Sequence, residues 1–153
     1  DLLQLTKAAV AETQAAHPEF QVQLTANGEL RGEWDAARLE QVLSNLLGNA
    51  VRHGTKGKPV RVTLESDGPN VTLYVHNDGH IPAELLPRVF EPFQNSRESR
   101  AKAGGLGLGL YIVEQIVLAH GGSVDVHSVP ADGTTFRIQL PRVCRALPQP
   151  RVP

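Results

Sequence analysis

Residues 104–112 read GGLGLGLYI and continue into VEQIVLAH, so a glycine-rich segment leads directly into an amphipathic helical pattern. Backbone N–H groups of glycines at a helix start can approach an anion closely, and the helix dipole favours phosphate there. The GxGxG spacing is neither a P-loop nor the dinucleotide-binding fingerprint, and it follows a loop instead of a strand. Because many glycine-rich helix starts are only hinges, the segment alone leaves both interpretations open.

The composition is that of an ordinary globular domain. The chain has 153 residues, of which 41% are hydrophobic and 20% charged, and its formal net charge is −1. This charge argues against a nucleic-acid partner, and no apolar stretch predicts direct contact with a membrane. A single cysteine, Cys144, cannot form an internal disulfide, and methionine is absent. We therefore expect a fragment of a longer cytoplasmic protein, whether or not that parent is membrane-anchored.

Hydrophobic periodicity predicts helices and strand pairs in alternation. Asp35 is placed to cap the second helix, and His120-Gly121-Gly122 to end the third. Asn27-Gly28 predicts a hairpin between the segments on either side. The predicted helices span 1–17, 35–53 and about 109–120, with a short proline-broken helix at 82–93, and the predicted strands span 20–26, 29–34, 58–66, 70–77, 123–129 and 134–140.

This order of elements favours a two-layer α/β sandwich. Strand pairs separated by single helices predict one mixed, mostly antiparallel sheet, covered on one face by three helices. The order does not match a regular series of parallel strands and crossover helices. A doubly wound nucleotide-binding fold is therefore less favoured.

The second predicted helix carries a rank of amide side chains on one face. Asn45 and Asn49 are four residues apart, so their side chains stack beside the apolar stripe, and Arg52 and His53 continue that face. Amide oxygens can ligate Mg²⁺ that is already surrounded by phosphate oxygens. A plain polar helix flank is the competing interpretation for the two asparagines alone.

Two further stretches have both functional and structural interpretations. VHNDGHIP at 75–82 places Asn-Asp-Gly at a strand end, which is a turn by default. FEPF at 90–93 has two phenylalanines around a proline, which is typical of a local packing anchor for the loop that follows.

Together, these stretches resemble the catalytic ATP-binding domain of sensor histidine kinases, in the GHKL superfamily with its Bergerat fold. LEQVLSNLLGNAVRH resembles the N box, VHNDGHIP the first glycine box, VFEPF the F box, GGLGLGLYIV the second glycine box and GTTFRIQLP the closing strand. The resemblance covers residues 1–142 and implies a mobile ATP lid at about 94–103. We expect residues 143–153 to form a disordered tail.

The resemblance implies roles for individual residues. Asn49 would ligate Mg²⁺, Asn45 would support the triphosphate, Arg52 would reach the phosphates and His53 would line the nucleotide. Gly79 would let adenine lie against the backbone. Thr134 would hold the water network at the adenine amino group. Further nucleotide-binding positions implied are Asn77, Asp78, Ile81, Phe93, Gly105, Leu106, Gly107, Leu108, Gly109 and Leu110, and the candidate lid cations for the γ-phosphate are Arg97, Arg100 and Lys102.

The position of Asn45 distinguishes branches of the superfamily. Gyrase-type and chaperone relatives have a glutamate there that activates water, whereas an amide cannot act as a general base. The resemblance therefore implies a protein histidine kinase domain that donates the γ-phosphoryl group of Mg-ATP. The acceptor would be a histidine on a separate dimerisation domain, since no histidine here is followed by glutamate. A homodimeric parent and a response regulator are the further partners implied.

The chain departs from the family pattern at the first glycine box. The family usually has DxGxG, whose aspartate accepts a hydrogen bond from adenine, but here the position is Asn77, followed by Asp78. Either residue could serve as the acceptor. Two alternatives remain: a degenerate docking module with weak or no ATP binding, and a related serine kinase or anti-sigma factor of the same superfamily.

Overall fold

The computed structural model describes residues 1–93 and 107–143. Within them, the helices are α1 (Leu2–Ala16), α2 (Ala36–His53) and α4 (Gly109–Ala119), with a 3₁₀ turn, η1 (Leu86–Arg88). The strands are β1 (Val22–Asn27), β2 (Val60–Asp67), β3 (Asn70–Asn77), β4 (Ser123–Val129) and β5 (Gly133–Pro141). The expected tail from 144 onward, with Cys144, lies outside the described residues.

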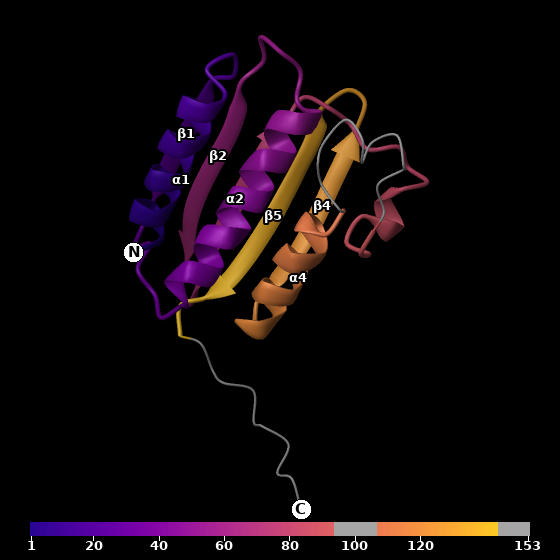
Figure 1. The fold of residues 1–153 in the computed structure, drawn as a ribbon. Coiled ribbons are helices and arrows are strands. Elements are labelled where there is room, and N and C mark those ends of the chain that lie inside the picture. The colour runs from indigo at the N-terminus through magenta and orange to yellow at the C-terminus, as the bar shows by residue number, and fades with distance from the viewer. Residues whose placement is uncertain (94–106, 144–153) are drawn as a thin grey trace, which may run out of the picture.

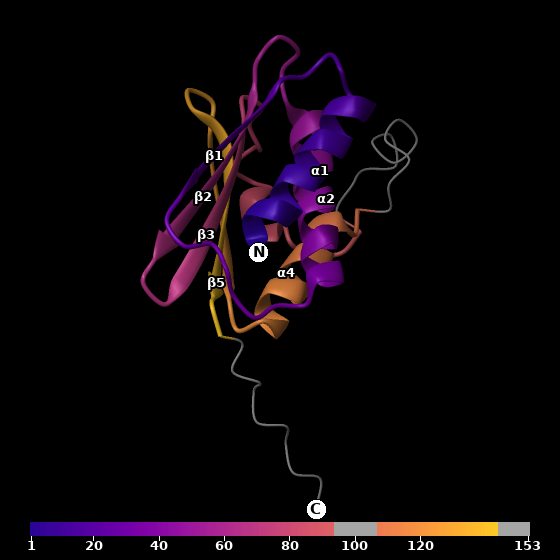
Figure 2. The same cartoon turned by 90° about the vertical axis from the view of Figure 1, so that its left-hand side faces the viewer.

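The strands form one sheet in the order β1-β2-β3-β5-β4. The β1–β2 pair is parallel and the other three pairs are antiparallel. Helices α1, α2 and α4 all lie on one face of this sheet, as the turned view shows (Figure 2). The predicted two-layer α/β sandwich with a mixed, mostly antiparallel sheet is confirmed.

The predicted first hairpin is wrong. Gly28 does turn the chain, with φ 86°, but residues 29–34 do not return along β1. β1 instead pairs in parallel with β2, from Val22↔Val60 to Asn27↔Glu65, and α2 lies in the connection that a parallel pair requires. The segment 29–34 has distant partners: Leu2 N donates to Leu30 O (3.0 Å), and Trp34 Nε1 donates to Pro141 O (2.7 Å).

Helix α2 is the centre of the helical layer. It lies between α1 and α4 and contacts both, and it packs on β3 (Figure 1). Asp35 caps it as predicted, its carboxylate accepting from Arg38 N (3.1 Å). The predicted stripe is buried: Leu39, Val42, Leu43, Leu46, Leu47 and Ala50. Because this stripe fixes the rotation of the helix, the flank that carries the amides has a fixed position.

His120 connects the end of α4 to the start of α2. Its Nδ1 donates to Ile116 O (2.8 Å), and its Nε2 accepts from Asp35 N (3.1 Å). The next residue, Gly121, has φ 74°, which ends the helix as the sequence predicts. The two helices that flank the candidate site are thus hydrogen-bonded to each other at their far ends.

The predicted short helix at 82–93 is only the turn η1 between irregular segments, because Pro82, Pro87 and Pro92 interrupt it. Among the helices of the described part of the chain, none has the length and apolarity that crossing a membrane requires.

Candidate functional site

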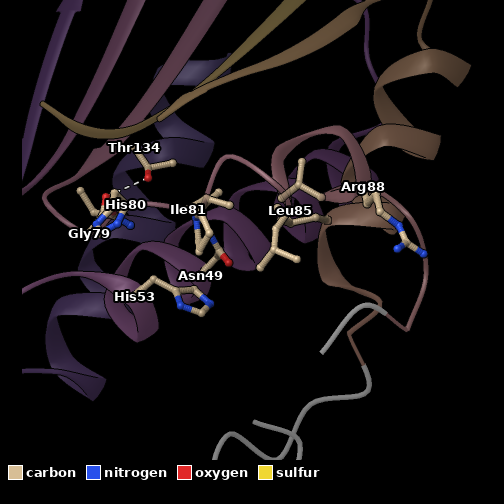
Figure 3. Close-up of a pocket in the computed structure, with 12 residues that line it drawn as sticks. Asn49, His53, Gly79, His80, Ile81, Leu85, Arg88 and Thr134 are labelled. Carbon is tan, nitrogen blue, oxygen red and sulfur yellow. Dashed lines mark hydrogen bonds between the residues drawn. The ribbon is translucent and has the colours of Figure 1, made fainter. Parts of the chain in front are cut away.

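A pocket of about 190 Å³ opens where the end of α2, the end of β3 and the start of β5 meet. Figure 3 shows its labelled side chains arranged from Gly79 and His53 at one end to Arg88 at the other. Seven predicted residues line it: Asn49, His53, Asn77, Gly79, Ile81, Leu110 and Thr134. Residues from three predicted motifs and the closing strand therefore share one cavity.

The pocket also has walls that the sequence analysis missed: His80, Pro82, Leu85, Arg88 and Val89. His80 and Pro82 belong to the first glycine box, Val89 begins the F box, and Leu85 and Arg88 lie between the two boxes. Ile81, Leu85 and Val89 are apolar and four residues apart, a spacing that could have indicated a shared face.

Asn77 is a buried polar residue among those that line the pocket. Its side chain is only 4% exposed, and its Nδ2 donates to Ala50 O on α2 (3.3 Å). Its Oδ1 is buried and has no hydrogen-bond partner among the described residues. A carboxylate could not donate to Ala50 O, so the amide suits this position. Asn77 thus keeps an unpaired acceptor in a residue that lines the pocket while remaining bonded to the helix.

Asp78, the other predicted acceptor, does not line the pocket. Its Oδ1 lies 3.5 Å from Nε2 of His76. His76 in turn contacts the Thr135 hydroxyl (2.8 Å). Of the two acceptors left open by the sequence, the structure brings only Asn77 into the cavity.

Gly79 is a glycine for a reason that the sequence did not indicate. A Cβ at this position would lie 1.9 Å from His53 O, so the turn after β3 packs directly on the last turn of α2. The carbonyl of Gly79 accepts from Thr134 Oγ1 (2.8 Å), the dashed contact in Figure 3. These two contacts hold the turn against both the helix and β5.

Ser128 on β4 completes this group of contacts and was not predicted. It is buried, its Oγ accepts from Ile81 N (2.7 Å), and it lies 2.7 Å from Thr134 Oγ1. A single serine in an alternating strand gives no local signal, because its partners are distant in the sequence.

The amide rank on α2 faces the start of α4. Asn45 Nδ2 donates to Gly109 O (3.3 Å), and a Cβ on Gly109 would lie 3.8 Å from Asn45 Cγ. Leu108 provides no side-chain cap for α4. Gly107, with φ 72°, accepts from Phe93 N (3.1 Å), which joins the second glycine box to the F box. The predicted phosphate-binding elements are thus neighbours.

Several predicted residues lie elsewhere. Arg52 is exposed on α2 and does not line the pocket. The other predicted residues that do not line it are Asn45, Phe93, Gly107, Leu108 and Gly109. The predicted lid at 94–103, with Arg97, Arg100 and Lys102, lies outside the described residues, as do Gly105 and Leu106.

His53 is the titratable group of the pocket with a perturbed pKa. Part of its imidazole is exposed, but burial against the pocket wall lowers its pKa, and the charge of Arg52 lowers it further. The side chain is therefore a neutral wall of the pocket at pH 7.

The model of the histidine kinase-, DNA gyrase B-, and HSP90-like ATPase family matches residues 34–143. The bacteriophytochrome of Pseudomonas aeruginosa is 39% identical over 143 residues, which are 92% of this chain and 20% of that protein. The signal transduction histidine-protein kinase AfsQ2 of Streptomyces coelicolor is 36% identical over 122 residues, which are 79% of this chain and 22% of that protein. The chain spans about a fifth of the length of these curated relatives.

The fold gives the same assignment. The nucleotide-free catalytic domain of histidine kinase ThkA has a TM-score of 0.81 and 28% identity, covering 93% of this chain and 95% of that domain. The chain therefore belongs, by sequence and by fold, to the histidine kinase-, DNA gyrase B-, and HSP90-like ATPase family, and its relatives include sensor histidine kinases.

Proposed function

We propose that this domain binds Mg-ATP and presents the γ-phosphoryl group to a histidine on a separate dimerisation domain of its parent. The observation that carries the proposal is the unpaired, buried Oδ1 of Asn77 in a cavity that Asn49 also lines. A buried acceptor without a partner is costly, and a ligand that donates to it removes this cost.

The base of the nucleotide occupies the end of the pocket nearest Asn77. The exocyclic amino group of adenine is a donor that matches Asn77 Oδ1. The flat faces of the base match the apolar side chains of Ile81, Leu85 and Leu110. This fit supports nucleotide binding over the degenerate docking module.

The phosphates lie toward the amide rank. Asn49 would hold Mg²⁺ through its amide oxygen, a neutral and hard ligand, and Asn45 supports the same region from one helical turn away. Bound Mg²⁺ neutralises charge on the phosphate oxygens. Arg52 and the lid cations Arg97, Arg100 and Lys102 would add positive charge to the triphosphate.

The domain acts by positioning. The amide of Asn45 cannot accept a proton from water at neutral pH, so the site holds the triphosphate without activating water. The acceptor histidine comes from the other domain. A response regulator then receives the phosphoryl group from that histidine. The parent is a homodimer, and this domain faces the cytoplasm.

Calorimetric titration with ATP, with and without Mg²⁺, tests the binding step. Magnesium should tighten binding to the wild type. Asn49→Ala should lose this gain, about tenfold if one ligand contributes about 1.4 kcal/mol. Ser44→Ala, at an exposed position of the same helix, is the matched control. Equal magnesium dependence in the wild type and Asn49→Ala would remove Asn49 from the metal site.

Transfer is tested by adding the parent's dimerisation domain and radiolabelled ATP. Label that is lost in acid and retained in base indicates phosphohistidine. Acid-stable label would instead support the serine kinase alternative.

A further inference from the structure

We propose that Ser128 is a positioning residue for the base of the nucleotide, and that it sets a preference for 6-amino over 6-oxo purines. This inference rests on the nucleotide binding proposed above. Ser128 does not line the pocket, so its effect must pass through the residues to which it is bonded.

Three connected hydrogen bonds around Ser128 each have a fixed direction. Ile81 N can only donate, so Ser128 Oγ accepts in their 2.7 Å contact. The carbonyl of Gly79 can only accept, so the single hydroxyl proton of Thr134 is committed to it at 2.8 Å. In the 2.7 Å contact between the two hydroxyls, Ser128 is therefore the donor and Thr134 the acceptor.

These bonds form a relay that runs in one direction, from Ile81 N–H through Ser128 and Thr134 to Gly79 O. Both ends of the relay are on the turn after β3, and both hydroxyls are on the β4–β5 hairpin. Gly79 and Ile81 line the pocket. Ser128 thereby holds this wall in place without touching the cavity.

The relay also fixes which hydrogen-bonding groups remain for a ligand. Thr134 lines the pocket but has no proton left to donate, only a lone pair. Asn77 is in the same condition, because its Nδ2 donates to Ala50 O and its Oδ1 is unpaired. These two buried side chains therefore offer acceptors and no donor.

Two buried acceptors favour a ligand group that carries donors. The exocyclic amino group of adenine has two N–H bonds and satisfies such a site. A 6-oxo group would place an oxygen against these acceptors and leave them unsatisfied, which is the larger penalty in hydrogen-bond recognition. Without Ser128, Ile81 N loses its acceptor and Thr134 loses its donor, so the turn that carries Gly79 O is held less firmly. The Thr134 proton is then no longer confined to Gly79 O and can turn toward an oxo group.

The test compares the dissociation constants of ATP and inosine triphosphate, which differ at the 6-position and in the N1 proton that accompanies the oxo form. The wild type should prefer ATP. The ratio of interest is the dissociation constant of inosine triphosphate divided by that of ATP. Ser128→Ala should reduce this ratio about tenfold, the size expected when one buried hydrogen bond is lost. Ser128→Thr keeps the hydroxyl and should leave the ratio at its wild-type value. Ser123→Ala, at the exposed start of the same strand, should not change it.

If Ser128→Ala weakens the binding of both nucleotides equally, the substitution has caused only a structural defect. That result overturns the proposal. If Ser128→Ala does not fold, Thr134→Val removes the same relay and must lower the ratio; an unchanged ratio overturns the proposal. If the wild type binds neither nucleotide, the proposed function itself fails and the inference fails with it. If it binds both equally, only the inference fails.

Discussion

The two ends of the candidate site are built in different ways. At the end proposed to hold the base (the base end), Asn77, Ser128 and Thr134 are at most 8% exposed, and each is bonded to another buried group. At the end proposed to hold the phosphates (the phosphate end), Asn45 and Asn49 are half-buried and Arg52 is exposed on a helix flank. Selecting one base needs fixed donors and acceptors, whereas holding a triphosphate needs charge that can be reached from solvent. The difference in burial follows that difference in task.

Asn77 is more firmly bonded in the structure than its sequence motif indicated. The Asn77-Asp78-Gly79 departure made the base end look weaker than the phosphate end. In the structure, the amide of Asn77 does what a carboxylate could not, since it donates to Ala50 O and still presents an acceptor. The base end is the more completely bonded of the two.

The largest loss of stability and of ATP affinity is expected from Gly79→Ala, a substitution at the base end. A Cβ there would lie 1.9 Å from His53 O, so the turn must move away from α2. Overpacking of this kind costs about 1–3 kcal/mol of unfolding free energy and should weaken ATP binding more than tenfold. Denaturant unfolding and ATP titration measure the two losses.

Gly109→Ala is the control at the phosphate end, because its Cβ would meet Asn45 at an ordinary 3.8 Å. It should change stability by less than about 1 kcal/mol, in the favourable direction if helix propensity dominates. Equal losses in the two glycine variants would contradict the assigned packing.

Asn77→Leu should have the next largest effect. It removes the acceptor and leaves Ala50 O without its donor, so ATP affinity should fall about tenfold with or without magnesium. Asn49→Ala should instead matter only when magnesium is present. A magnesium-dependent loss in Asn77→Leu would show that the two ends are not separate.

Arg52→Ala should have a smaller effect, because the side chain is exposed and outside the pocket lining. We expect ATP affinity to fall about twofold to fivefold at low salt and the loss to shrink as salt screens the charge. Adenosine, which has no phosphates, should bind the variant and the wild type equally. A loss for adenosine would place Arg52 at the base end.

The smallest effect concerns pH. Burial lowers the pKa of His53 in the folded state below its ordinary value of 6.5. Between these two values the unfolded chain binds more protons, so stability is complete above 6.5 and declines as pH falls toward the lowered pKa. Unfolding curves from about pH 7.5 to about pH 5.5 should show a steeper decline for the wild type than for His53→Gln. An equal decline of stability with pH in the two proteins would contradict a lowered pKa of His53.

Much of the fold could be predicted from periodicity and turn residues. The stripe from Leu39 to Ala50, the cap at Asp35 and the strand pairs around Gly68 and Gly133 are local patterns, and the structure has them. The pairing of β1 with β2 could not be predicted in this way, because Asn27-Gly28 indicates only a turn and the partner of β1 lies beyond α2.

The site was predictable to the extent that its motifs are contiguous. Asn49, Asn77 and Thr134 lie in recognisable stretches, and the structure brings them to one pocket. Ser128 and the packing of Gly79 on His53 depend on contacts between segments distant in the chain. No single stretch of sequence contains that information.

The most direct test of the central claim is one calorimetric titration series of ATP into the wild type, Asn77→Leu and Asn49→Ala, each with magnesium and with a chelator. We predict saturable wild-type binding that magnesium strengthens, a loss in Asn77→Leu under both conditions, and a loss in Asn49→Ala with magnesium alone. Absence of saturable binding to the wild type at millimolar ATP would contradict the account and support a docking module.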